Sequence, residues 1–206
     1  MSVRDLFGGA MRIEVPSEWI DTEAFMDIIK RPVPDNQEIF MSPQNTADDS
    51  PDAARPIALF VDILELATDV VDLDQLPYFH VIEILKRDER ADEIEGLVVA
   101  PGSPLELHLS STWLPEDAGE ISATAATFEG CDVEVVVVRL QKCNTDLIFS
   151  LHGRIAASQE VANEQSGCPS LTEIVASLDI IDWGLFGGAA NEEEGTEEQG
   201  DRLLGS

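Results

Sequence analysis

The chain has 206 residues, a length that favours one domain with a buried core over two full domains. Its 41 acidic and 12 basic residues give a formal net charge of −29. This excess of acid argues against nucleic acid as a partner, because phosphate binding needs clustered lysine and arginine. A basic protein surface is the natural complement, and solubility is the alternative reason for the charge.

The chain shows no signal for a membrane or for secretion. There is no apolar run of about 18 residues that could span a bilayer, and the N-terminus lacks a basic segment followed by an apolar one. The three cysteines, Cys131, Cys143 and Cys168, are odd in number and have no CxxC spacing, which argues against disulfides and zinc. We therefore expect a chain of the reducing nucleus and cytoplasm with no cofactor.

The first elements are a strand, a short helical segment and a second strand. Apolar and charged residues alternate over residues 11–15, which predicts a half-buried strand. Residues 17–29 can form one or two helical turns, and Pro32 and Pro34 prevent their continuation. The segment RPVPDNQEIF is therefore expected to be a stiff, extended connection into a strand at about residues 37–42.

A buried strand and the main helix follow a surface insertion. Residues 43–55 are polar and acidic and contain proline, which is typical of a surface insertion. The apolar, branched run IALFVDILEL, residues 57–66, predicts a buried strand, with a helix as the weaker alternative. Helical spacing predicts the main helix at about 77–90, after Asp72 or Asp74 as a cap.

The second half is rich in strands. Residues 121–128, 132–140 and 146–155 are β-rich runs joined by short connections, which predicts an antiparallel meander, while residues 91–119 show no clear pattern. Ser170 and Glu173 have the spacing of a capping box at the start of an amphipathic helix. We expect one α/β (α+β) domain over residues 1–188 and a Glu-rich disordered tail over 189–206.

No sequence motif of an enzyme accompanies the three histidines. His80, His108 and His152 lack the patterns of metalloproteases, serine hydrolases and nucleotide-binding loops. Neither acidic loop has the spacing of a calcium site. A hydrolase remains an alternative, and it requires a deep apolar pocket around His80 or His152 with a nucleophile in reach.

Two groups of polar residues are candidates for binding. They are Asp35, Asn36, Gln37 and Glu38 in the first group, and Asp62 and Glu65 in the second. Their spacing alone favours an ordinary turn and solvated strand residues. However, Asp62 and Glu65 interrupt an apolar strand, where carboxylates are costly unless they face water or a partner. Positions three apart on a regular strand point to opposite faces, so one shared surface needs a bulge, a strand end or a helical turn.

Several segments in order resemble one family. LFGGAMRIEVP, PVPDNQEIF, IALFVDILEL, VVRLQKCNTDLIFSLH and IVASLDIIDWGLFG, over residues 6–187, are similar to the Ran guanine nucleotide release factors, the Mog-type nuclear import proteins. PDNQE is the most specific piece, and the NTDL turn before a strand is the second. The acidic insertion, residues 91–119 and the tail depart from the pattern.

The resemblance implies a mostly antiparallel sheet flanked by helices, a sandwich similar to the photosystem II PsbP proteins. It implies a monomeric, non-catalytic protein that binds the GTPase Ran, promotes loss of its nucleotide and supports nuclear import. The acids of the family's Ran-binding strand match Asp62 and Glu65, and PDNQE adds Asp35, Asn36, Gln37 and Glu38. These side chains are expected to converge on one firm acidic docking face.

A PsbP-like acidic scaffold that binds a different protein is the alternative from another class. The sequence leaves open whether GTP- or GDP-loaded Ran is preferred, which other transport factors take part, and what the tail and insertion do.

Overall fold

The structure is a computed structural model. It describes residues 1–21, 33–43, 56–87, 90–99, 103–106, 121–129, 133–153 and 169–186. Among these residues, no helix combines the length and the apolar character needed to cross a membrane. The predicted acidic tail, almost all of the predicted insertion, His108, Cys131 and Cys168 lie outside the described residues.

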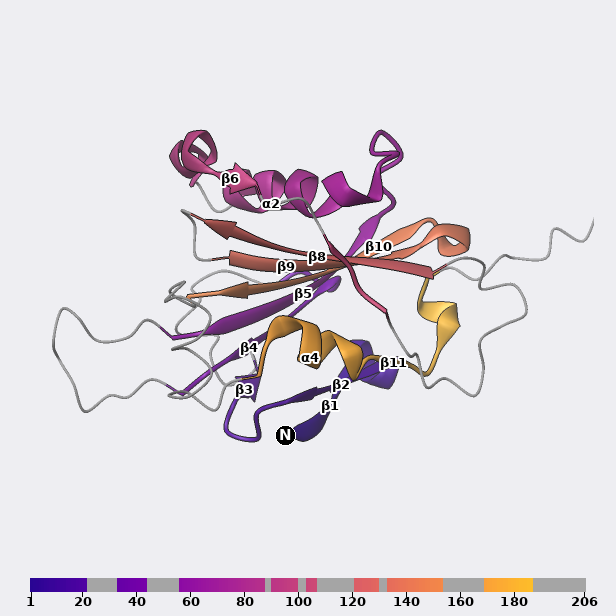
Figure 1. Cartoon of the computed structure of the whole chain (residues 1–206). Coiled ribbons are helices and arrows are strands. Elements are labelled where there is room, and N and C mark those ends of the chain that lie inside the picture. Colours follow the sequence, from indigo (N-terminus) through magenta and orange to yellow (C-terminus); the bar gives the residue numbers. More distant parts are fainter. Residues whose placement is uncertain are drawn as a thin grey trace, which may run out of the picture.

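A large antiparallel sheet forms the middle layer of the fold (Figure 1). Its strand order is β3-β4-β5-β10-β9-β8-β6, and β7 also pairs with β8. The strands are β3 (Ile20–Asp21), β4 (Gln37–Met41), β5 (Ala58–Glu65), β6 (Val98–Val99), β7 (Ser103–Pro104), β8 (Ile121–Glu129), β9 (Val133–Leu140) and β10 (Thr145–His152).

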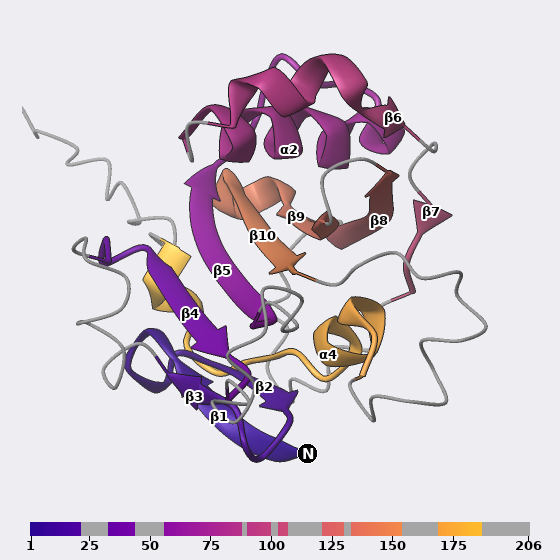
Figure 2. The same ribbon diagram turned by 90° about the vertical axis from the view of Figure 1, so that its left-hand side faces the viewer.

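Different elements cover the two faces of this sheet. Helix α2 (Leu76–Arg87) lies on one face, as Figure 2 shows. On the other face lie helix α4 (Leu171–Ala176) and a small antiparallel sheet of order β1-β2-β11. The strands of the small sheet are β1 (Ser2–Leu6), β2 (Met11–Val15) and β11 (Asp179–Ile180). The 3-10 turns are η1 (Phe7–Gly9), η3 (Leu73–Gln75), η4 (Ala91–Gly96), η5 (Gln141–Cys143) and η6 (Trp183–Phe186).

The central strands are apolar on both faces because both faces are covered. In β9, Val136 and Val138 pack toward α4 and the small sheet, whereas Val135 and Val137 pack toward α2. This alternation explains why the run VEVVVVRL contains four consecutive valines, since a strand with one solvated face would alternate with polar residues. The sheet therefore separates two hydrophobic cores.

Most of the predicted elements are confirmed. The strand at residues 11–15 alternates buried and exposed side chains, the strands near 37–42 and 57–66 are β4 and β5, and the meander is β8, β9 and β10. The Ser170–Glu173 capping box is present at α4, where each side chain bonds the backbone of the other residue.

Two predictions about the elements were wrong in part, and one strand was not predicted. Ile20 and Asp21 pair with β4 as a short strand, where helical turns were predicted, and the rest of that segment is outside the described residues. Helix α2 ends at Arg87, since Arg90 already begins the next 3-10 turn. No strand was predicted at residues 2–6, where β1 pairs with β2 along its whole length.

Candidate functional site

The pairing of β4 with β5 brings the two predicted polar groups together. Gln37 lies directly opposite Asp62 in the antiparallel register. Gln37 Nε2 donates a hydrogen bond of 2.6 Å to Asp62 Oδ1, and both residues are almost fully buried. Asn36, the preceding residue, exchanges backbone and side-chain bonds with Ile63, since its carbonyl accepts from Ile63 N and its Nδ2 donates to Ile63 O, both at 2.9 Å. The segment PDNQE is thus fixed onto β5.

Helix α2 supplies a cation to the same carboxylate. Arg87 Nη1 donates to Asp62 Oδ1 at 3.1 Å from the last turn of the helix. A buried carboxylate needs such partners, because an unpaired charge in the interior is costly. Asp62 therefore joins β4, β5 and α2 at one point.

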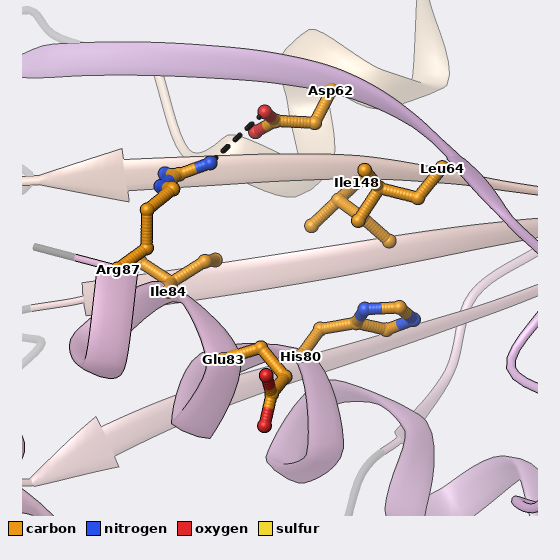
Figure 3. A pocket seen from close by; sticks show the side chains of 7 residues that line it. All are labelled: Asp62, Leu64, His80, Glu83, Ile84, Arg87 and Ile148. Carbon is orange, nitrogen blue, oxygen red and sulfur yellow. Dashed lines mark hydrogen bonds and ion pairs between the residues drawn. The ribbon is translucent and has the colours of Figure 1, made fainter.

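A cavity of about 250 Å³ lies beside this ion pair (Figure 3). Its lining comes from β5 and β10 on one side and from α2 on the other. The lining residues are Asp62, Leu64, His80, Glu83, Ile84, Arg87 and Ile148. Three of these side chains are aliphatic and four are polar, so the cavity offers both apolar contact and charge.

The predicted acids do not all point to one surface. The β5–β10 register runs without a break from Ala58 to Glu65, so no bulge turns Asp62 and Glu65 to the same side. Asp62 faces α2, whereas Glu65 lies on the alternate face at the strand end and is exposed. Glu38 also points away from α2, since its Oε1 accepts from Phe7 N at 2.9 Å. The expectation of one shared face is corrected accordingly.

Exposed carboxylates nevertheless gather where β4 begins and β5 ends. Asp35 is exposed in the turn that is closed by Gln37 N donating to Pro34 O at 2.9 Å. Glu65 ends β5, and Asp69 is exposed in the loop that follows. We call these three exposed carboxylates, Asp35, Glu65 and Asp69, together with the buried Asp62, the acidic end of the sheet. The role of the six predicted residues in binding a partner stays a prediction.

A buried charge cluster holds the loop after β5. Arg139 and Asp146 face each other across β9 and β10, and Arg139 Nε and Nη2 each donate to the carboxylate at 2.8 Å. Asp146 Oδ2 also accepts from Ala67 N at 3.0 Å and lies 3.3 Å from His80 Nε2. Arg139 donates further to the carbonyl oxygens of Ala67 and Val70, both at 3.0 Å.

Burial acts to raise the pKa of Asp146, but these hydrogen bonds, chiefly from Arg139 and then from His80 and Ala67 N, outweigh it. They lower the pKa from 3.8 to about 2. The carboxylate is therefore charged at neutral pH. The sequence analysis missed this cluster.

Two observations bear on enzyme chemistry. His80 lines the cavity, but its Nε2 faces Asp146, and the described lining contains no serine, threonine or cysteine as a nucleophile. His152 lies 3.0 Å from Ser150 Oγ through its Nε2, outside that lining. Across the described parts of the chain, no three His, Cys, Asp or Glu side chains are grouped to hold a metal ion.

The fold and the site together define an acidic α/β sandwich protein with an ion-paired cavity on the helical face of an antiparallel sheet. The profile of the Ran-interacting Mog1 proteins matches residues 4–153. This match covers most of the chain, which therefore belongs to the family of Ran-interacting Mog1 proteins. A comparison with curated protein sequences gives no match.

Solved structures of Mog1 have a similar fold. The Ran-binding protein Mog1p of Saccharomyces cerevisiae superposes with a TM-score of 0.52 and 20% identity, covering 90% of this chain and 97% of that one. A mutant of the protein Mog1 gives a TM-score of 0.51, again with 20% identity, over 90% and 98% of the two chains. The solution structure of cyanobacterial PsbP from Synechocystis gives 0.48 and 9% identity, over 87% and 91%.

Proposed function

We propose that this chain binds the small GTPase Ran through the acidic end of its sheet, as a monomer, and that it promotes release of the bound guanine nucleotide. It thereby supports nuclear protein import and works in the nucleus and the cytoplasm. It acts by binding and not by covalent catalysis. The family match supports Ran as the partner.

The observation that carries the proposal is the 2.6 Å hydrogen bond between Gln37 and Asp62. It joins PDNQE, the segment most specific to the family, to VDILE, the segment that matches the family's Ran-binding strand, at a single point of the sheet. The bonds between Asn36 and Ile63 fix the same turn, so little conformational entropy is lost when a partner docks on Asp35 beside it.

The mechanism is differential binding. A release factor must hold nucleotide-free Ran more tightly than nucleotide-bound Ran, and the coupling between the two ligands is reciprocal. Carboxylates at the acidic end achieve this if they bind lysine or arginine groups of Ran that otherwise neutralise nucleotide phosphates.

Calorimetric titration of nucleotide-free Ran at moderate salt tests the proposal. Asp62→Asn is expected to weaken binding by about 1–3 kcal/mol, because its carboxylate is nearly buried and hydrogen-bonded. Glu65→Gln is expected to cost less than about 1 kcal/mol, because Glu65 is exposed to solvent and screened by salt.

Glu14→Gln is the matched control. Glu14 is exposed on β2, in the layer opposite α2, and this variant removes the same charge as the other two. It should bind Ran as the unaltered chain does, and all variants should keep their thermal unfolding temperature within a few degrees. Wild-type affinity in the Asp62→Asn, Glu65→Gln double variant would contradict the proposal and favour a scaffold for another protein.

A further inference from the structure

The cavity between β5 and α2 combines charge with an apolar floor. Asp62 and Glu83 bring carboxylates, which pair with Arg87 at 3.1 Å and with Lys86 at 2.7 Å. Leu64, Ile84 and Ile148 line the cavity with aliphatic carbon. A long basic side chain has the matching composition, since lysine and arginine carry a charged head on an apolar stem. The chemistry of the cavity therefore suits a basic side chain better than an apolar or an acidic one.

Arg87 already makes such a contact within the chain, but the two partners are unequally accessible. The Arg87 side chain is 34% exposed, whereas that of Asp62 is 5% exposed. The arginine sits in the last turn of α2, where part of its side chain is in contact with solvent. The carboxylate cannot leave, because it lies within the sheet and also accepts from Gln37.

We propose that this cavity receives a lysine or arginine side chain of Ran. In the free protein Arg87 pairs with Asp62, and the incoming side chain of Ran displaces Arg87 from this carboxylate. This inference rests on the proposed function. The exchange keeps a cation on the buried carboxylate at every stage, which avoids the cost of an unpaired buried charge. Gln37 Nε2 keeps the carboxylate oriented while the cations exchange.

The proposal makes an unusual prediction, because removing a basic residue should strengthen binding to a basic partner. When Arg87 occupies Asp62, the carboxylate is not available to Ran. The apparent affinity for Ran is therefore reduced in proportion to the fraction of molecules in which Arg87 occupies this position. Arg87→Met removes the charge, so it should tighten the binding of nucleotide-free Ran by about fivefold, the scale of a partly exposed ion pair. Arg87→Lys keeps a competing cation and should stay near wild-type affinity.

Arg12→Met is the matched control. Arg12 lies on the small sheet and pairs with Asp5 at 2.7 Å, so its loss makes the chain more acidic by the same amount without touching Asp62. It should tighten binding by less than about twofold. The gain in Arg87→Met should also disappear when Asp62→Asn is added, because the two substitutions act on one contact.

A second variant tests the cavity itself. Leu64 is half-buried on its wall, and Leu64→Phe places a larger side chain in the space that the incoming stem would occupy. This variant should weaken Ran binding about tenfold or more, with its unfolding temperature unchanged.

The outcomes separate the two proposals. Binding of Ran by the wild type with no gain in Arg87→Met over Arg12→Met would overturn this inference and leave the proposed function intact. Absence of Ran binding by both chains would overturn both. Tighter binding of free arginine by Arg87→Met, without a gain for Ran, would make the cavity a small-molecule site and overturn the inference.

Discussion

Asp146 shows how one buried carboxylate is kept charged. Its side chain is fully buried, which acts to raise its pKa. The bonds from Arg139, the contact with His80 and the bond from Ala67 N outweigh burial and lower the pKa to about 2. Since the folded value lies below the unfolded value of 3.8, the charged form stabilises the fold in full above that value. This contribution is lost as the pH falls through about 2.

The free energy of unfolding should therefore depend on Asp146 in acid. Between pH 5 and pH 2, the wild type should lose roughly 2 kcal/mol more stability than Asp146→Asn. Urea unfolding at several pH values in this range measures the difference. Parallel curves for the two proteins would show that the cluster does not lower the pKa of Asp146.

Asp62 differs from Asp146 in what surrounds it. Asp146 accepts hydrogen bonds from β9 and from the loop after β5. Asp62 pairs with Arg87, whose side chain is one-third exposed, and both residues line the cavity. The first arrangement fits structural support, and the second leaves room for exchange with a partner. The two carboxylates therefore differ in their surroundings, although both are buried in the same sheet.

Among the elements, the loop after β5, residues 66–72, is hydrogen-bonded to buried side chains of β9 and β10. Arg139 reaches the carbonyl oxygens of Ala67 and Val70, and Asp146 takes the amide of Ala67. These bonds fix the loop that follows Glu65 in the chain and carries the exposed Asp69. The cluster thus links the core to the acidic end.

Removing one member of this cluster should be costly. Arg139→Met leaves Asp146 without its main partner and should lower stability by about 3–5 kcal/mol, and adding Asp146→Leu should restore part of the loss. Urea unfolding measures the stability, and amide hydrogen exchange in residues 66–72 should accelerate in the single variant. A loss of less than about 1 kcal/mol would contradict this role.

The sequence predicted elements well where local rules decide them. The capping box of Ser170 and the alternation of β2 are local patterns, and both are present. The helical prediction at Ile20 was wrong because strand pairing with β4 overrode a weak helix propensity, as tertiary contacts often do. Helix α2 ends at Arg87, earlier than the predicted end at about residue 90, and the sequence pattern did not indicate this earlier end.

The candidate site was only partly predictable. The family segments identified Gln37 and Asp62, but no local pattern shows that α2 crosses the sheet so that Arg87 meets Asp62. Arg139 offered a usable signal, because it is a buried charged residue in an otherwise largely apolar strand, as Asp62 is. A charged residue at such a position indicates a buried partner.

At the scale of the whole molecule, charge is the dominant surface property. The predicted tail, 189–206, has six acids and one base, so its charge of −5 leaves −24 on the rest of the chain. A field of this size attracts a basic partner and speeds encounter. Selectivity must come from placed groups, of which the Gln37–Asp62–Arg87 contact is the best defined.

The release of a fluorescent GDP analogue from Ran measures the proposed activity itself. The chain is expected to accelerate release in proportion to its concentration until it saturates, and Asp62→Asn is expected to reduce the acceleration at least several-fold while Glu14→Gln does not. A release rate that stays at its basal value at all concentrations of the wild-type chain would contradict the proposed nucleotide release.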